Sequence, residues 1–241
     1  MKMMEVIDVF NKKVKEIILK ENVYCVLLIG AGAKTEFENF YLLNDIDLFI
    51  ITKDRNCFER EVVDIDGVSF DISYMSLDLL KKSILEKNSL IITALSNYKC
   101  IYNIGTKIDK LLDEIKRIYI LGPEPIRREE LDYIRFKLFK DYEDILTRLD
   151  DEITACFLVN NLFKSILISY FKLNRIWIPK DKKILREIEK LDLDLFSVCK
   201  EFLQENSINK KITILLEILD YVLKPFGGYL KYWNRGKFLL K

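Results

Sequence analysis

Two aspartates, Asp45 and Asp47, are the residues of this chain whose types and spacing best suit chemistry. They open an apolar run, Leu48–Ile51, and side chains two residues apart on a strand point to the same face. Carboxylates at the start of such a strand need a partner or a metal ion. Hard oxygen ligands suit Mg²⁺, which also engages substrate phosphates. The pair therefore predicts a magnesium site that handles phosphate groups.

A turn of small residues precedes the pair. The apolar run Val23–Ile29, typical of a central strand, is followed by Gly-Ala-Gly-Ala at positions 30–33. A glycine turn leaves room for phosphate groups close to the backbone. Turn and aspartates together indicate a site that holds a nucleotide triphosphate on a divalent metal.

A third carboxylate comes from a predicted hairpin. Asp66-Gly67 is a common two-residue hairpin turn, and Asp71 lies on the polar face of the second arm. Asp71 could complete the site, although Asp64 and Asp66 compete for the same role. Two metal ions ~4 Å apart would then clamp the entering and leaving oxygens of a transfer reaction.

The Asp-x-Asp tripeptide alone is weak evidence, because it occurs three times. Asp64-Ile65-Asp66 runs into Gly67, so a hairpin end explains it. Asp192-Leu193-Asp194 lies in a charged stretch between helices and is predicted to be solvated surface. Only Asp45-Ile46-Asp47 follows a strand and a small-residue turn, so the context of the tripeptide carries the prediction.

The elements that position these residues mix strand and helix patterns in the first half of the chain. Five strands are expected, over Val23–Ile29, Asp45–Thr52, Arg60–Asp66, Val68–Tyr74 and Lys99–Tyr102. Helices are expected over Met4–Lys20, Leu77–Glu86, Leu90–Ser96 and Thr106–Arg117. The last helix is predicted to begin with a capping box formed by Thr106 and Asp109.

The clearest break in the chain is Gly122-Pro123-Glu124-Pro125. Beyond it the patterns predict helices alone, over Ile126–Leu149, Ile153–Phe171, Asp181–Lys190, Leu195–Glu205 and Ile212–Leu223. We therefore predict an α+β fold, with a mixed sheet flanked by helices over residues 1–121 and an all-α bundle over residues 126–241.

One segment, Ile153–Phe171, is apolar enough to resemble a membrane span. Asn160, Asn161 and Lys164 lie at its centre, where polar groups are costly in lipid. A buried core helix is the better interpretation. The N-terminal residues follow a helical pattern and show no signal peptide.

Composition narrows the chemistry further. Lysine and arginine number 39 against 38 aspartates and glutamates, so total charge gives no reason to expect general affinity for nucleic acid. The absence of histidine excludes histidine bases and histidine-ligated zinc. The five cysteines have no metal-chelating spacing, and their odd number disfavours a disulfide framework. A cytoplasmic location is expected.

At the small-residue turn and the three aspartates Asp45, Asp47 and Asp71, the chain resembles the polymerase-beta-like nucleotidyltransferase superfamily. That family combines Gly-Ser, a short insert, Asp-x-Asp or Asp-x-Glu, and a third acid on a later strand. Gly30–Glu36 stands where Gly-Ser-x-Ala-Arg-Gly-Glu is common, Asn44–Leu48 stands where Ser-Asp-Ile-Asp-Leu is common, and Phe70–Ser73 fits the third-acid strand. The second half is similar to the C-terminal domain of aminoglycoside and lincosamide nucleotidyltransferases, most clearly at Arg175–Lys180.

The resemblance implies two sets of site residues. The catalytic and metal-binding residues would be Asp45, Asp47 and Asp71. The nucleotide-binding residues would be Gly30, Ala31 and Lys34. Mg²⁺ would hold ATP as co-substrate, and a hydroxyl of a small molecule would attack the α-phosphorus with loss of pyrophosphate.

The resemblance also implies the partners. The helical half would form the far wall of the substrate site, and an aminoglycoside or lincosamide antibiotic is a candidate acceptor. Neither nucleic acid nor a membrane is an expected partner. A homodimer is left open.

Two departures from the family pattern matter. Ala31 replaces the usual serine, and the interval from Gly30 to Asp45 is longer than usual. Ala31 supports a rival interpretation, in which the chain is a non-catalytic binding or scaffold protein with a degenerate site. Another rival is a protein- or RNA-directed nucleotidyltransferase of a toxin–antitoxin type. Near-neutral charge and the full helical domain argue against that rival.

Overall fold

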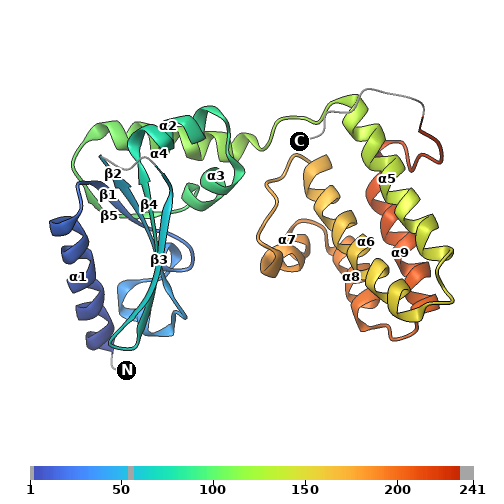
Figure 1. Cartoon of the computed structure of the whole chain (residues 1–241), viewed down its shortest axis with the longest axis horizontal. Coiled ribbons are helices and arrows are strands. Elements are labelled where there is room, and N and C mark those ends of the chain that lie inside the picture. Colours follow the sequence, from blue (N-terminus) through green and yellow to red (C-terminus); the bar gives the residue numbers. More distant parts are fainter. Residues whose placement is uncertain (1–2, 54–56, 234–241) are drawn as a thin grey trace. The chain divides into compact units, whose positions relative to one another are not determined.

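The computed structural model describes residues 3–53 and 57–233. The chain divides after Gly122 into two compact units, Met1–Gly122 and Pro123–Lys241. The first contains a mixed sheet flanked by helices, and the described part of the second is helical (Figure 1). The predicted α+β fold class is therefore confirmed.

A five-stranded sheet of order β3-β4-β2-β1-β5 forms the centre of the first unit. Its strands are β1 (Val23–Leu28), β2 (Ile46–Thr52), β3 (Glu59–Ile65), β4 (Val68–Ser76) and β5 (Lys99–Asn103). β2 and β4 run parallel, and the other neighbouring strands are antiparallel. The β3–β4 hairpin turns at Asp66 and Gly67, which both have positive φ, as a tight two-residue turn requires.

Helices cover both faces of this sheet (Figure 1). They are α1 (Met3–Lys20) on one face and α2 (Leu77–Leu85), α3 (Ser89–Leu95) and α4 (Thr106–Leu121) on the other. Ile46, Leu48 and Ile50 of β2 belong to the core beneath α1. Phe49 and Ile51 alternate with them and are buried on the opposite face. Burial on both faces explains why β2 is a continuous apolar run.

The insert between Gly30 and Asp45 forms two short 3₁₀ helices that the sequence patterns did not predict. They are η1 (Gly32–Lys34) and η2 (Phe37–Leu42). The rings of Phe37 and Phe40 pack on Phe10 of α1, with centroid separations of 5.8 and 5.4 Å. Part of the extra length of this interval is therefore a segment, η2, that packs against α1.

The start of α4 corrects one prediction. Gly105 is its N-cap and no side chain caps the helix, so the expected capping box of Thr106 and Asp109 is wrong. Asp109 instead accepts a hydrogen bond from Asn103 Nδ2 at 2.7 Å. The helix also continues beyond Arg117 to Leu121.

The second unit contains each helix that the sequence predicted, with shifted ends. They are α5 (Arg128–Leu146), α6 (Glu152–Leu173), α7 (Ile184–Leu191), α8 (Leu193–Gln204) and α9 (Ile208–Leu223), with 3₁₀ turns η3 (Asp181–Lys183) and η4 (Lys224–Phe226). One hydrophobic core joins these helices.

In the described part of the chain, α6 is the one helix long and apolar enough to cross a membrane. Val159, Leu162 and Ile166 face the core of the unit, whereas Asn160 and Lys164 are exposed. The prediction of a core helix therefore holds for one face of α6. Of the 18-residue apolar stretch of this helix, 39% is buried. Such two-sidedness is typical of a helix packed at the edge of a bundle.

Asp192 corrects another prediction, because it is an internal anchor instead of solvated surface. Its carboxylate accepts hydrogen bonds from the Leu195 backbone N–H at 2.9 Å, the Tyr221 hydroxyl at 2.9 Å and the Tyr170 hydroxyl at 3.3 Å. Burial, reinforced by the charge of Asp192, raises the pKa of Tyr170 to about 12. One carboxylate thus joins α6, α8 and α9.

Replacing Asp192 by alanine is expected to lower the free energy of unfolding by about 2–3 kcal/mol. The substitution removes an N-cap worth about 1 kcal/mol and deprives two tyrosine hydroxyls, one of them in a partly buried hydrogen bond, of their acceptor. Urea unfolding followed by circular dichroism measures the change. Asp194→Ala, in the exposed first turn of the same helix, is the control and should change stability by about 0.5 kcal/mol or less. Equal losses in the two variants would contradict the anchor role.

Candidate functional site

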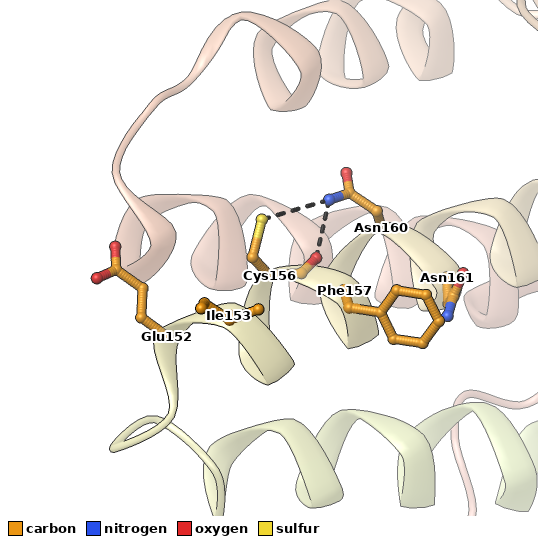
Figure 2. Close-up of a pocket in the computed structure, with 6 residues that line it drawn as sticks. All are labelled: Glu152, Ile153, Cys156, Phe157, Asn160 and Asn161. Atoms are coloured by element: carbon orange, nitrogen blue, oxygen red, sulfur yellow. Dashed lines mark hydrogen bonds between the residues drawn. The ribbon is translucent and has the colours of Figure 1, made fainter.

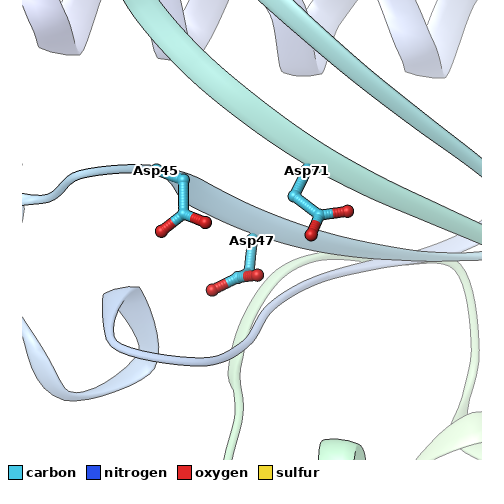
Figure 3. Close-up of side chains that lie close together, drawn as sticks. All are labelled: Asp45, Asp47 and Asp71. Atoms are coloured by element: carbon cyan, nitrogen blue, oxygen red, sulfur yellow. The ribbon is translucent and has the colours of Figure 1, made fainter. Parts of the chain in front are cut away.

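Three aspartates, Asp45, Asp47 and Asp71, lie together at one end of the parallel pair β2–β4 (Figure 3). Asp47 and Asp71 are register partners across this pair, so their side chains share a face. Asp45 immediately precedes β2 and shares that face. One carboxylate oxygen from each residue lies within 4.8 Å of the other two. The structure thus brings together the three acids that the sequence singled out.

These carboxylates lie at the edge of the hydrophobic core. Asp45 is exposed, and Asp47 and Asp71 are half-buried. Further along the same face of each strand, Phe49 and Met75 are buried. The acids are therefore open to solvent on one side and bounded by apolar packing on the other, which strengthens their interaction with a cation.

The donor set suits a divalent cation. Mg²⁺ binds oxygens at about 2.0–2.1 Å, so oxygens on opposite sides of one ion are about 4.2 Å apart. The observed limit of 4.8 Å is close to this value, and small side-chain rotations would close the difference. Carboxylate oxygens are also the ligands that Mg²⁺ prefers. The three residues therefore fit Mg²⁺.

Gly30 lies directly against the aspartates. Its φ is +64°, and a Cβ at this position would be 2.1 Å from Asp47 Oδ2 and 2.9 Å from Asp47 Cγ. The neighbouring Ile29 N–H donates to the Asp47 carbonyl at 3.0 Å, which ties the turn to β2. A side chain at position 30 would both strain the backbone and collide with a candidate metal ligand. The small-residue turn and the acids therefore form one continuous site.

Ala31 and Lys34, the other predicted nucleotide-binding residues, belong to the same turn and are exposed. The Ala31 carbonyl accepts hydrogen bonds from the Lys34 N–H and the Thr35 hydroxyl, both at 3.0 Å. These bonds fix the backbone of the turn beside Asp47. A contact between Lys34 and a phosphate stays a prediction.

Lys99 of β5 secures the far end of this turn, a role that sequence patterns did not indicate. Its Nζ lies 3.3 Å from the Thr35 carbonyl and 3.6 Å from Glu36 Oε2. The same ammonium is 4.7 Å from the centre of the Phe37 ring. The turn is therefore attached to the sheet through β5 as well as β2.

Arg60 of β3 is a second residue of this site that sequence patterns missed. Its Nε donates to Asp71 Oδ1 at 2.7 Å and its Nη2 to Asp71 Oδ2 at 2.5 Å, a two-pronged pair. The hydrogen bond and charge of Asp71 raise the pKa of Arg60, with further contributions from Asp47 and Asp45. The Arg60 side chain is 59% exposed, against 17% for Asp71. A largely exposed cation thus faces the acids from the solvent side.

The hairpin register contains the signal that could have found Arg60. A two-residue turn at Asp66-Gly67 pairs Val62 with Asp71. Residues two apart on a strand share a face, so Arg60 lies diagonally across from Asp71 on the face of the acids. Diagonal neighbours are within reach of a long side chain.

A shallow hollow of about 550 Å³ lies elsewhere, on the exposed face of α6 (Figure 2). It is lined by Glu152, Ile153, Cys156, Phe157, Asn160 and Asn161. Asn160 Nδ2 donates to the Cys156 carbonyl at 2.8 Å, so part of its polar capacity is used within the helix. The lining offers a single carboxylate and no basic group, and it lacks the convergent polar groups of a catalytic site.

No protein-family model matches the chain, and no curated protein matches its sequence. Among solved structures the chain is similar to a nucleotidyltransferase-like protein from Exiguobacterium sibiricum 255-15. The TM-score is 0.47 at 12% sequence identity, and the match covers 88% of this chain and 72% of that protein. At this level of similarity the function is inferred from the residues and geometry of the chain itself.

Proposed function

We propose that the first unit is a magnesium-dependent nucleotidyltransferase domain that transfers AMP from ATP to a hydroxyl of a small molecule. The observation that carries the proposal is the convergence of Asp45, Asp47 and Asp71 beside the turn at Gly30. Three hard-ligand carboxylates next to a turn with no room for a side chain are what a metal–triphosphate complex needs. The sequence resemblance to polymerase-beta-like nucleotidyltransferases supports the same reaction.

In the proposed reaction the residues act mainly by positioning. Asp45, Asp47 and Asp71 would hold Mg²⁺, which when bound neutralises the triphosphate and the departing pyrophosphate. Gly30 keeps the backbone of the turn against Asp47, so that phosphate and metal sites adjoin. Fixed geometry and charge would supply most of the rate enhancement.

The pair with Arg60 favours a ligand role for Asp71 over a role as proton acceptor. Both Asp71 oxygens already accept hydrogen bonds from Arg60. Each carboxylate oxygen has a second lone pair, so Asp71 can bind a metal while it remains paired. Acceptance of a proton would oppose that ion pair. The proton of the attacking hydroxyl is therefore assigned to Asp45, Asp47 or solvent.

For the acceptor we propose a hydroxyl-bearing antibiotic of the aminoglycoside or lincosamide type. The support is the resemblance of the helical second half to the C-terminal domains of enzymes that modify such compounds. The cytoplasm, where ATP and Mg²⁺ are present, is the proposed location.

The test is transfer of label from α-³²P-ATP in the presence of Mg²⁺. Acceptors to be screened are aminoglycosides, lincosamides and fractionated cell extract, and the Asp45→Asn/Asp47→Asn double variant is the control. Label on a small molecule that needs both aspartates supports the proposal. Label on protein or RNA supports the directed-transferase rival. Failure of the wild-type chain to bind millimolar Mg-ATP in calorimetry would contradict any nucleotidyltransferase activity.

Restoring serine at position 31 is expected to strengthen nucleotide binding. Ala31 is exposed in the turn beside Asp47, so Ala31→Ser adds a hydroxyl donor where phosphates are proposed to bind. One such hydrogen bond is worth about 0.5–1.5 kcal/mol, and we expect the KM for ATP to fall about three- to tenfold with little change in kcat. Steady-state kinetics measure this. Ala33→Ser, in the same turn, is the control, and equal changes in both variants would argue against a specific phosphate contact at position 31.

A further inference from the structure

The aspartate cluster concentrates negative charge, and a basic side chain is paired with it. Asp45, Asp47 and Asp71 bring three formal negative charges into one small volume. Arg60 carries one positive charge, and its guanidinium donates two hydrogen bonds to Asp71. The carboxylates attract a divalent cation, but the same cation is repelled by Arg60.

Arg60 is placed to act on ligands and has little part in the core. It lies on β3, the edge strand of the sheet, and its side chain is 59% exposed. Glu61, the next residue, points to the opposite face, where it pairs with Lys13 at 3.4 Å and accepts from the Tyr74 hydroxyl at 3.2 Å. Those contacts attach β3 to the rest of the unit, so the orientation of the strand does not depend on the Arg60–Asp71 pair.

We propose that Arg60 makes metal binding depend on nucleotide, as a resident counter-cation of the aspartate cluster. Without nucleotide, Arg60 stabilises Asp71 and opposes entry of a second positive group. A bound triphosphate brings negative charge to the turn beside Asp47. Arg60 repels a bare metal ion, but it attracts the negatively charged metal–triphosphate complex. The domain would thus bind metal together with nucleotide in preference to metal alone, a coupling that is reciprocal by thermodynamic linkage. This inference rests on the proposed function.

The test compares two affinities in Arg60→Gln and wild-type protein. Binding of Mn²⁺ alone is followed by the electron paramagnetic resonance of the free ion, and binding of Mg-ATP is followed by calorimetry at saturating Mg²⁺. We expect Arg60→Gln to bind Mn²⁺ alone about tenfold more tightly and Mg-ATP about tenfold more weakly. Arg60→Lys keeps the charge and should stay near the wild type in both. Arg117→Gln, an exposed arginine of α4 paired with Glu114, is the matched control and should change neither affinity.

The opposite signs of the two shifts are decisive. If Arg60 only held Asp71 in position, Arg60→Gln would weaken binding of Mn²⁺ and Mg-ATP alike, and that result would overturn the inference. Unchanged affinities in Arg60→Gln would overturn it as well, while leaving the nucleotidyltransferase proposal intact. Absence of both Mn²⁺ and Mg-ATP binding in the wild type would instead remove the proposed function and the coupling together. Thermal melts establish that each variant is folded.

Discussion

Asp47→Asn is expected to reduce nucleotidyl transfer by about 10³-fold while the domain stays folded. Asparagine has nearly the same shape, so the packing of β2 is retained. It removes the central charge of a cluster whose oxygens lie within 4.8 Å of one another, and its amide nitrogen cannot bind a metal. Losses of this size follow removal of a group that stabilises charge in a transition state. Single-turnover transfer at saturating Mg-ATP separates this effect from weaker binding.

The chain contains its own control for this substitution. Asp66 is also part of an Asp-x-Asp tripeptide, but it lies at the hairpin turn with φ of 52°, a conformation that asparagine adopts readily. Asp66→Asn should therefore retain activity within about a factor of two. An Asp47→Asn protein that kept more than about a tenth of wild-type transfer would contradict a metal-binding role for Asp47.

Local patterns sufficed for the strands, the helices and the face on which each acid lies. Alternation along β4 placed Asp71 on a polar face, and spacing placed Asp45 with Asp47. The parallel pairing that makes Asp47 and Asp71 register partners is a contact between segments distant in sequence. Periodicity within one segment carries no information on its neighbour in the sheet, so the proximity of the three acids needed the structure.

The features that the sequence did not reveal depend on partners from other elements. Asp192 looks like surface in a charged stretch, yet two tyrosines from α6 and α9 reach it. Arg60 resembles other strand arginines until the hairpin register places it diagonally across from Asp71. In each case the sequence shows the residue type but not its partner, because tertiary packing determines which side chains meet.

Gly30→Ala is the second substitution with a large expected effect, and it tests the join between turn and acids. The added Cβ meets a left-handed backbone and an Asp47 oxygen 2.1 Å away. The backbone strain alone is about 1–2 kcal/mol. Relief of the collision requires the Asp47 carboxylate to leave its present position in the cluster. We therefore expect about a hundredfold loss of transfer together with about 2–3 kcal/mol lower stability.

Gly67→Ala separates these two causes. Gly67 has φ of +79°, but a Cβ there would meet nothing within 4 Å. It shares the backbone strain of Gly30 without the collision, so Gly67→Ala should lose about 1–2 kcal/mol of stability and keep its activity. Urea unfolding and transfer kinetics on both variants give the comparison. Similar activity in the two would mean that the turn does not control Asp47.

A double-variant cycle with Asp47→Asn makes the same contact measurable. If Gly30→Ala acts by displacing the Asp47 carboxylate, it should remove little further activity from a protein that already lacks this carboxylate. The two losses would then be strongly non-additive, as expected for neighbouring residues that act through one group. Additive losses would show that Gly30 serves the nucleotide independently of the metal ligands, and the glycine turn and the aspartates would be two sites instead of one.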